Sequence, residues 1–513
     1  MVQPFSERGH AGARWRVGLP LVAVLGALHS LPMVATWAWP LQMLAVGLLA
    51  WRISIATPRR AAWLGLVFGT AWLLCSFWWL FISMHRYGGL PAWIAGAAVF
   101  LLSAALSLYL AAATAAFARW RRGRAGLDAL LFASLWLLAE LARAVIFTGF
   151  PWAASGYAHV DGPLAALAPW VGVYGIGFVS AALAAWFGLQ RPLLWGPWFM
   201  QLLAVGLVLL MSWLAGPVQF TEPAGTLTLT LLQSNVAQDE KFAPEHLPQA
   251  LAWAREKLLA ARGELVVGPE TVIPLLPEQL DPDFWKPLLA HFRNGSQAAL
   301  IGLPLGDEAT GYTNSVAGVS SATAKETDGF YRYDKHHLVP FGEFIPPGFH
   351  WFTQMMNIPL GDFNRGPLAA PSFAVKGERV APNICYEDLF GEELAERFAD
   401  AATAPTIFAN ISNIGWFGDT IAVDQHLNIS RFRALEFQRP MLRATNTGAT
   451  VVIDHLGIVR HALAPHTQGV LDAEVQGRRE LTPFARWAAA LGLWPLVALG
   501  LLVVMPSALR RRP

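Results

Sequence analysis

The sequence has few charged residues and few cysteines. Only 14% of its 513 residues are charged, whereas 55% are hydrophobic. Soluble domains carry about 25% charged residues, so this composition argues against a purely soluble protein. The same figures exclude intrinsically disordered and collagen-like chains. The two cysteines, Cys75 and Cys385, are too few for a secreted disulfide framework.

Lysine is absent from residues 1–221, where acids are also rare. This part has 13 Arg and four acidic residues, a net charge of +9, whereas residues 222–513 have 24 basic and 31 acidic residues, a net charge of −7. We therefore expect two parts that lie in different solvents. Neither part has the basic face of a nucleic-acid-binding protein, so no nucleic-acid partner is expected.

Long apolar runs predict membrane-spanning helices, because about 20 apolar residues cross a bilayer. The predicted spans are residues 18–34, 36–51, 61–82, 92–117, 126–147, 165–189, 192–215 and 487–508. No small-residue cleavage site follows the first run, so a cleavable signal peptide is not expected. Arginines gather in alternate loops, and the positive-inside rule then predicts cytoplasmic termini and an extracytoplasmic segment 222–480. The expected domains are 1–221 with seven spans, 222–480, and a final span and tail in 481–513.

Residues 222–480 alternate between strand and helix patterns. Predicted strands are residues 226–236, 265–267, 298–304, 314–319, 330–338, 379–385, 406–411 and 450–453, and predicted helices are 245–262, 392–401 and 422–438. Such alternation favours a layered α/β domain.

One apolar loop, residues 341–363, separates two of these strands. It holds five Phe, one Trp and three Pro residues, and the prolines prevent a long helix. It can fold back on its own domain, or it can form a lid toward the bilayer, since exposed apolar patches mark interaction sites.

Cys385 is a candidate nucleophile at the end of a predicted strand. A lone cysteine on an apolar strand is usually a small core residue, and it becomes a nucleophile only where another group removes or stabilises its proton. Glu270 and Lys335 also follow strands. Alone they read as a solvated loop acid and a surface lysine, but together they could supply a general base and an oxyanion-stabilising ammonium.

These three residues together resemble the nitrilase, or carbon–nitrogen hydrolase, superfamily. With the membrane part included, the whole chain resembles the apolipoprotein N-acyltransferase family of the bacterial inner membrane. The most specific segments are 147–152 (FTGFPW), 335–346 (KHHLVPFGEFIP), 384–387 (ICYE), 416–418 (WFG) and 443–446 (RATN). The resemblance implies a four-layer α-β-β-α catalytic domain carried on an eight-span membrane base.

The resemblance also implies roles for individual residues. Cys385 matches the family's nucleophile, Glu270 its general base and Lys335 its lysine, while Glu343, Tyr386 and Glu387 match supporting positions. The implied reaction passes an acyl chain from a phospholipid, expected to be phosphatidylethanolamine, through a thioester to the amine of a diacylglyceryl-cysteine apolipoprotein. It is expected to use no metal and no cofactor.

Gly268, Phe242 and the 413–415 segment depart from the family pattern, and we expect them to affect the shape of the pocket rather than the class of reaction. Glu140 and Arg143 lie three residues apart in one predicted span and are expected to pair inside the helix bundle. Two alternatives stay open from the residues alone. One is a membrane-tethered amidase that uses water as acceptor, and the other is a non-catalytic lipid carrier or scaffold.

Overall fold

The chain forms two compact units in a computed structural model that describes residues 7–190, 195–216, 218–326, 329–349, 351 and 362–509. The first unit contains residues up to Trp78, then 93–218, and the chain from Leu493 onward. The second unit contains residues 79–92 and 219–492. Each unit is described separately below.

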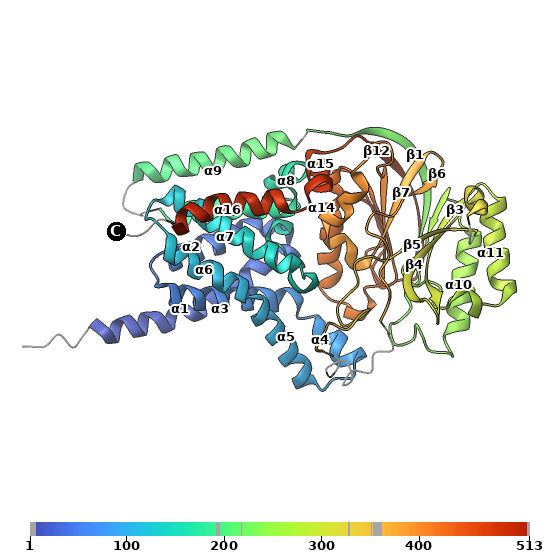
Figure 1. The fold of residues 1–513 in the computed structure, drawn as a ribbon, viewed down its shortest axis with the longest axis horizontal. Helices are drawn as coiled ribbons and strands as arrows, with labels where there is room; N and C mark the ends of the chain where they lie inside the picture. Colours follow the sequence, from blue (N-terminus) through green and yellow to red (C-terminus); the bar gives the residue numbers. More distant parts are fainter. Residues whose placement is uncertain are drawn as a thin grey trace, which may run out of the picture. The chain divides into compact units, whose positions relative to one another are not determined.

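The first unit is helical (Figure 1). Its main helices are α1 (Glu7–Ser30), α2 (Trp39–Ser54), α3 (Pro58–Phe77), α5 (Ala92–Leu106), α6 (Leu108–Trp120), α7 (Ala125–Val145), α8 (Ala168–Gly188), α9 (Trp195–Ala215) and α16 (Trp494–Leu509). Within the described residues, four helical stretches are long and apolar enough to cross a membrane: 58–77, 92–120, 125–148 and 163–188. These apolar helices fit a membrane protein.

Two of the predicted spans differ from the helices of the structure, and a third is described only in part. The span predicted at 61–82 ends as α3 at Phe77, and the chain from Trp79 belongs to the second unit. The span predicted at 487–508 is two helices, α15 (Pro483–Leu491) and α16, because Gly492 adopts a positive φ of 55° that ends α15. Of the span predicted at 192–215, residues 192–194 lie outside the described residues.

Small residues let the helices of this unit approach closely. A Cβ built on Gly47 of α2 would lie 2.8 Å from the Ala184 carbonyl oxygen, and one on Gly188 of α8 would lie 2.1 Å from the Gly47 carbonyl oxygen. Backbones this close admit only glycine, which is typical of helix packing in membranes.

Glu140 and Arg143 form the expected buried pair on α7. Their charged atoms lie 3.7 Å apart, and both residues are buried. The Glu140 carboxylate also accepts hydrogen bonds from the Ser155 amide and hydroxyl, at 2.7 and 2.9 Å, and Arg143 donates to the Trp152 carbonyl at 3.1 Å. The pair therefore fastens α7 to the 152–155 turn, which is a structural role.

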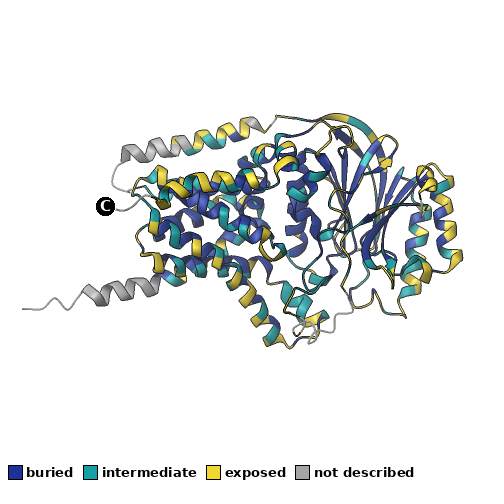
Figure 2. Ribbon diagram, in the orientation of Figure 1, coloured by how far each residue is buried: buried dark blue, intermediate teal, exposed yellow. Residues whose placement is uncertain are grey.

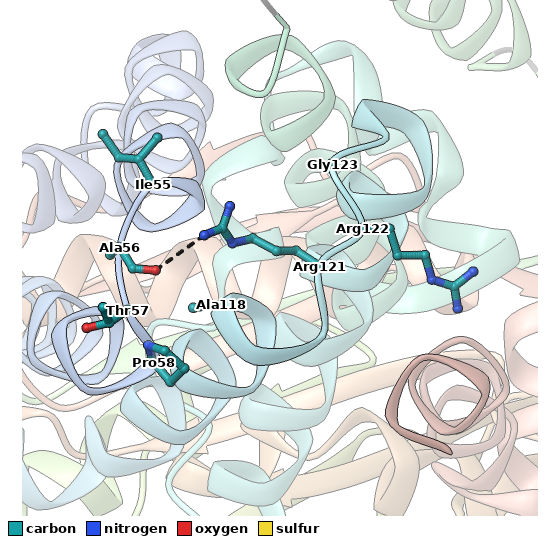
Figure 3. Close-up of a pocket in the computed structure, with 8 residues that line it drawn as sticks. All are labelled: Ile55, Ala56, Thr57, Pro58, Ala118, Arg121, Arg122 and Gly123. Carbon is teal, nitrogen blue, oxygen red and sulfur yellow. Dashed lines mark hydrogen bonds between the residues drawn. The ribbon is translucent and has the colours of Figure 1, made fainter. Parts of the chain in front are cut away.

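A hollow of about 480 Å³ opens between the α2–α3 turn and the α6–α7 turn. Figure 3 shows its lining: Ile55, Ala56, Thr57, Pro58, Ala118, Arg121, Arg122 and Gly123. Arg121 donates to the Ala56 carbonyl at 3.4 Å and ties the two turns together. None of the candidate site residues lines this hollow.

Two six-stranded sheets build the second unit. The first sheet has the order β12-β1-β2-β3-β4-β5, and the second has the order β11-β10-β9-β8-β7-β6. Their strands are β1 (Glu222–Gln233), β2 (Leu265–Val267), β3 (Ala298–Asp307), β4 (Gly311–Val319), β5 (Tyr331–Asp334), β6 (Phe373–Val375), β7 (Glu378–Ile384), β8 (Ile407–Ser412), β9 (Met441–Thr445), β10 (Val451–Ile453), β11 (Val459–Ala462) and β12 (Gly469–Arg479). Strands β1, β2 and β3 run parallel to one another, as do β7, β8 and β9.

The two sheets pack face to face, with helices on their outer faces (Figure 1). Alternate residues of β1, Leu227, Leu229 and Leu231, point into the core between the sheets, as the period of two along a strand requires. Helices α10 (Leu247–Ala260) and α11 (Pro282–Asn294) cover the first sheet. Helices α13 (Gly391–Ala395), α14 (Ala422–Phe437) and α15 cover the second. The central strands β2, β8 and β9 are wholly buried, and the arrangement is a four-layer α-β-β-α sandwich (Figure 2).

Several predicted elements of this unit extend beyond the observed strand or helix. The strand predicted at 330–338 stops at Asp334, because the amides of His336 and His337 turn to donate to the Glu387 side chain. The helix predicted at 392–401 is α13 followed by a short 3₁₀ turn that ends at Phe398. Strand β2 begins and ends at the predicted residues.

Candidate active site

Glu270 follows β2, where Gly268 and Pro269 turn the chain out of the first sheet. Its carboxylate accepts two short hydrogen bonds: Oε1 from Asn314 Nδ2 at 2.7 Å, and Oε2 from the Asn413 amide at 2.7 Å. The residue is only 8% exposed. Each carboxylate oxygen thus accepts from an N–H donor, and the two hydrogen bonds fix the orientation of the carboxylate.

Gly302 of β3 lies directly against this turn. A Cβ on Gly302 would lie 2.4 Å from the Pro269 carbonyl oxygen and 3.0 Å from the Glu270 Cα. Both neighbours are backbone atoms, so the turn itself would have to move. The absence of a side chain at Gly302 therefore determines where Glu270 stands.

Gly302→Ala is expected to reduce the activity of the site by about 100-fold, because displacement of a reacting group by about 1 Å has an effect of that size. The matched control is Gly469→Ala, since a Cβ there meets only Leu463 at an ordinary 3.6 Å. Specific activity and the thermal unfolding midpoint of both variants test this. Equal activity in the two variants would contradict the role given to Gly302.

Lys335 and Glu343 form an ion pair beside Glu270. The Lys335 Nζ lies 2.8 Å from Glu343 Oε2 and 3.8 Å from Glu270 Oε1, and the lysine is 1% exposed. Burial alone would lower the pKa of Lys335, but the Glu343 and Glu270 carboxylates outweigh it and raise that pKa above its usual value. The two carboxylates therefore favour the charged, ammonium form of Lys335.

Asn314 is a site residue that the sequence did not reveal. From the middle of β4, its side-chain amide donates to both Glu270 Oε1 and Glu343 Oε1, each at 2.7 Å. The two donors of one NH₂ group thereby hold the two carboxylates in a fixed relation. Only its polar character on a buried strand could have indicated this role.

Cys385 lies at the end of β7 with a strained backbone. Its φ is 52°, in the left-handed region that a non-glycine residue adopts at a cost of about 1–3 kcal/mol. Its carbonyl accepts from Asn410 Nδ2 at 3.1 Å and from His426 Nε2 at 3.2 Å. These contacts hold the sharp turn that presents the thiol, and Cys385 as a residue is half-buried.

A buried polar network stands behind this turn. His426 Nε2 also donates to Asp388 at 2.9 Å, while Arg443 lies 3.3 Å from Asp388 and donates to His426 Nδ1 at 3.1 Å. His426 is thus a neutral ring that donates from Nε2 and accepts at Nδ1. Arg443 and Asp388 are both fully buried, and each compensates the charge of the other.

The site residues interact electrostatically with the thiol. Burial raises the pKa of Cys385, and the negative charges of Glu270, Glu343 and Asp388 raise it further, whereas Lys335 lowers it. Cys385 therefore rests as a neutral thiol and needs a base to become a nucleophile. The structure thus brings the three predicted residues Glu270, Lys335 and Cys385 into one site.

Glu387 holds the backbone around the nucleophile. Its carboxylate accepts from the amides of Ile384 at 2.6 Å and His336 at 2.7 Å, and from the Tyr333 hydroxyl at 2.7 Å. It therefore joins the end of β7 to the segment after β5. Tyr386 is buried, with its ring 5.2 Å from that of Phe390.

A segment distant in sequence packs on the loop that supports Glu270. Trp79 is 1% exposed, donates to Gln425 Oε1 at 3.1 Å and lies 4.3 Å from the Phe417 ring. Phe417 belongs to the 413–418 loop, and the loop's first amide, that of Asn413, is one of the two donors to Glu270. Residues 79–92 therefore contribute to the support of the site.

The apolar 341–363 loop is described only in part. Phe341 and Phe349 pack edge to face at 5.4 Å, and Phe349 and Trp351 are exposed. Residues 350 and 352–361 lie outside the described residues. The choice between a lid and a folded-back loop stays a prediction.

The two-sheet fold and the Glu–Lys–Cys site define a nitrilase-like domain of the carbon–nitrogen hydrolase class. Residues 229–484 match the sequence model of the family described as "Carbon-nitrogen hydrolase". Residues 25–186 match the model described as "Apolipoprotein N-acyltransferase N-terminal domain". The two matches cover parts of both units.

Relatives that match over nearly their whole length identify the family within this class. Proteins named apolipoprotein N-acyltransferase from Verminephrobacter eiseniae, Ralstonia nicotianae and Bordetella bronchiseptica are 53%, 46% and 42% identical to this chain. The alignments cover 93%, 98% and 98% of this chain, and 94%, 95% and 98% of the relatives. The chain belongs to the apolipoprotein N-acyltransferase family and is an acyltransferase, as its motifs predicted.

Proposed function

We propose that this enzyme transfers an acyl chain from a phospholipid to the N-terminal amine of a diacylglyceryl-cysteine lipoprotein, through a thioester on Cys385. The juxtaposition of Cys385 with a hydrogen-bonded Glu270 carboxylate and a charged Lys335 carries the proposal. A thiol, a base and an ammonium are the groups that acyl transfer requires.

In the first half-reaction, Glu270 takes the thiol proton as the sulfur attacks the ester carbonyl carbon. The tetrahedral oxyanion then collapses, the ester C–O bond breaks, and Glu270 returns the proton to the leaving lysophospholipid oxygen. Lys335 and the Tyr386 amide stabilise the oxyanion. Because its pKa is raised, Lys335 stays charged throughout.

In the second half-reaction, Glu270 takes a proton from the acceptor amine as the nitrogen attacks the thioester. The C–S bond breaks, an amide forms, and the proton returns to the Cys385 sulfur. One carboxylate thus serves both halves, as microscopic reversibility of a ping-pong reaction permits.

The membrane arrangement is proposed from the chain's charge pattern. Residues 1–221 would supply seven spans, 222–480 the catalytic domain on the periplasmic side of the inner membrane, and 481–513 the eighth span and a cytoplasmic tail. The arginines of alternate loops and the four long apolar helices support this. A reporter fused after Arg512 should be cytoplasmic, and an external reporter would contradict the topology.

The acceptor distinguishes acyl transfer from hydrolysis. Purified enzyme given phosphatidylethanolamine and a diacylglyceryl lipopeptide should add a third acyl chain to the peptide, measured by mass spectrometry. Release of free fatty acid alone would favour the amidase-type alternative. If the acyl chain passes neither to the lipopeptide nor to water, the result would favour the non-catalytic carrier.

A further inference from the structure

Lys241 is a second buried lysine at this site. The reaction proposed for Glu270, Lys335 and Cys385 does not use it. It lies in the turn of residues 238–242 that follows β1, and it is 5% exposed. Its Nζ donates to the Glu270 main-chain carbonyl at 2.8 Å. Among the described residues this is its one hydrogen bond to a side chain or backbone, although an ammonium has three donors.

Lys241 interacts electrostatically with two of the reacting groups, Glu270 and Cys385. Burial lowers the pKa of Lys241 to about 8, and the two groups that oppose this shift are Glu270 and Cys385. No carboxylate forms an ion pair with Lys241 within the described part of the chain. A buried charge without a close partner is costly, so the structure retains it against a free-energy penalty.

The site without Lys241 has an excess of negative charge, which the ammonium of Lys241 offsets. Two carboxylates, Glu270 and Glu343, face the single ammonium of Lys335, so these three groups carry one net negative charge. Asp388 is already paired with Arg443. When Cys385 gives its proton to Glu270, the negative charge of that carboxylate passes to the sulfur and then to the oxyanion, and the net charge of the site stays the same. Lys241 restores the balance, because two ammonium groups then match two carboxylates before Cys385 reacts.

We propose that Lys241 is a positioning residue that fixes the main chain of Glu270 and whose positive charge stabilises the ionised form of Cys385. It exchanges no proton with the substrate. The inference rests on the proposed role of Cys385 as nucleophile, but its test does not use the acyl-transfer reaction.

The test measures alkylation of Cys385 by iodoacetamide in the full-length, detergent-purified enzyme, followed by mass spectrometry from pH 6 to pH 9. Between pH 6 and 8, Lys241→Met and Lys241→Gln should react about tenfold more slowly than the parent, the effect of one pKa unit on the thiol. Above pH 8 the difference in alkylation rate between the parent and these two variants should become smaller, because Lys241 itself loses its proton. Lys241→Arg should keep the parent rate below pH 8 and exceed it above pH 8.

Two comparisons separate charge from structure. Lys257→Met removes a half-buried lysine that forms an ion pair with Glu256, and it should leave the rate unchanged. Thermal unfolding midpoints show whether each variant folds. If Lys241→Met is unstable, Lys241→Gln decides, because glutamine can still donate to the Glu270 carbonyl without carrying a charge.

Parent-like alkylation of Lys241→Gln, or an equal slowing in Lys241→Arg and Lys241→Met, would overturn the proposal. So would a parent enzyme whose Cys385 is not alkylated at any pH in this range. Normal alkylation without an acyl adduct from phospholipid would instead contradict the proposed function while leaving the role of Lys241 intact.

Discussion

Cys385→Ala is expected to abolish the acyl adduct and to lower acyl transfer by at least about 10⁴-fold, because loss of a nucleophile removes the covalent route. The parent enzyme incubated with phosphatidylethanolamine should gain one acyl chain on the peptide that contains Cys385. Mass spectrometry of that peptide, and of the released lysophospholipid, measures both quantities.

Cys75→Ser is the matched control, since Cys75 is the second thiol of the chain and lies on α3 in the other unit. This variant should keep both the adduct and the activity. An acyl adduct that survives Cys385→Ala, or one that disappears in Cys75→Ser, would show that the thioester forms on a residue other than Cys385. Either result would contradict the mechanism.

Glu270→Gln is expected to slow both half-reactions by about 10³-fold, within the range found for loss of a general base. The glutamine has nearly the same size but cannot take a proton. Its NH₂ group would also face a donor, either Asn314 Nδ2 or the Asn413 amide, and one of these N–H groups would lose its acceptor. Adduct formation and adduct consumption, followed separately, measure the two half-reactions.

Glu278→Gln is the control for this prediction, because Glu278 is an exposed acid shortly after Glu270. It should keep parent rates in both steps. A Glu270→Gln enzyme that forms the adduct normally but fails to pass it on would restrict Glu270 to the second step, contrary to the proposed double role.

The chemistry-bearing residues could be predicted because each follows a predicted strand within three residues of its observed end. β2 precedes Glu270, β5 precedes Lys335 and β7 precedes Cys385, and apolar strands are the clearest pattern in residues 222–480. The motifs around them then indicated the family. Their roles in the reaction remain predictions, although the structure gathers them in one place.

The supporting residues could not be predicted, because their signals are tertiary. Asn314 lies inside β4, where nothing in the sequence pairs it with two glutamates 29 and 44 residues away. Strand β9 was missed because Arg443 interrupts its apolar pattern, yet Asp388 compensates that arginine in the core. Helix α11 was missed because Pro287 lies within it.

The contact between Trp79 and the 413–418 loop determines where the catalytic unit can be cut out of the chain. A fragment of residues 219–492 would contain both sheets and all six candidate residues, but it would lack Trp79. Phe417, on the loop whose first residue holds Glu270, would then lose its contact with the Trp79 ring, and Gln425 Oε1 on α14 would lose the hydrogen bond from Trp79. A minimal soluble enzyme would therefore need residues 79–92 grafted back, and it could not be obtained by truncation alone.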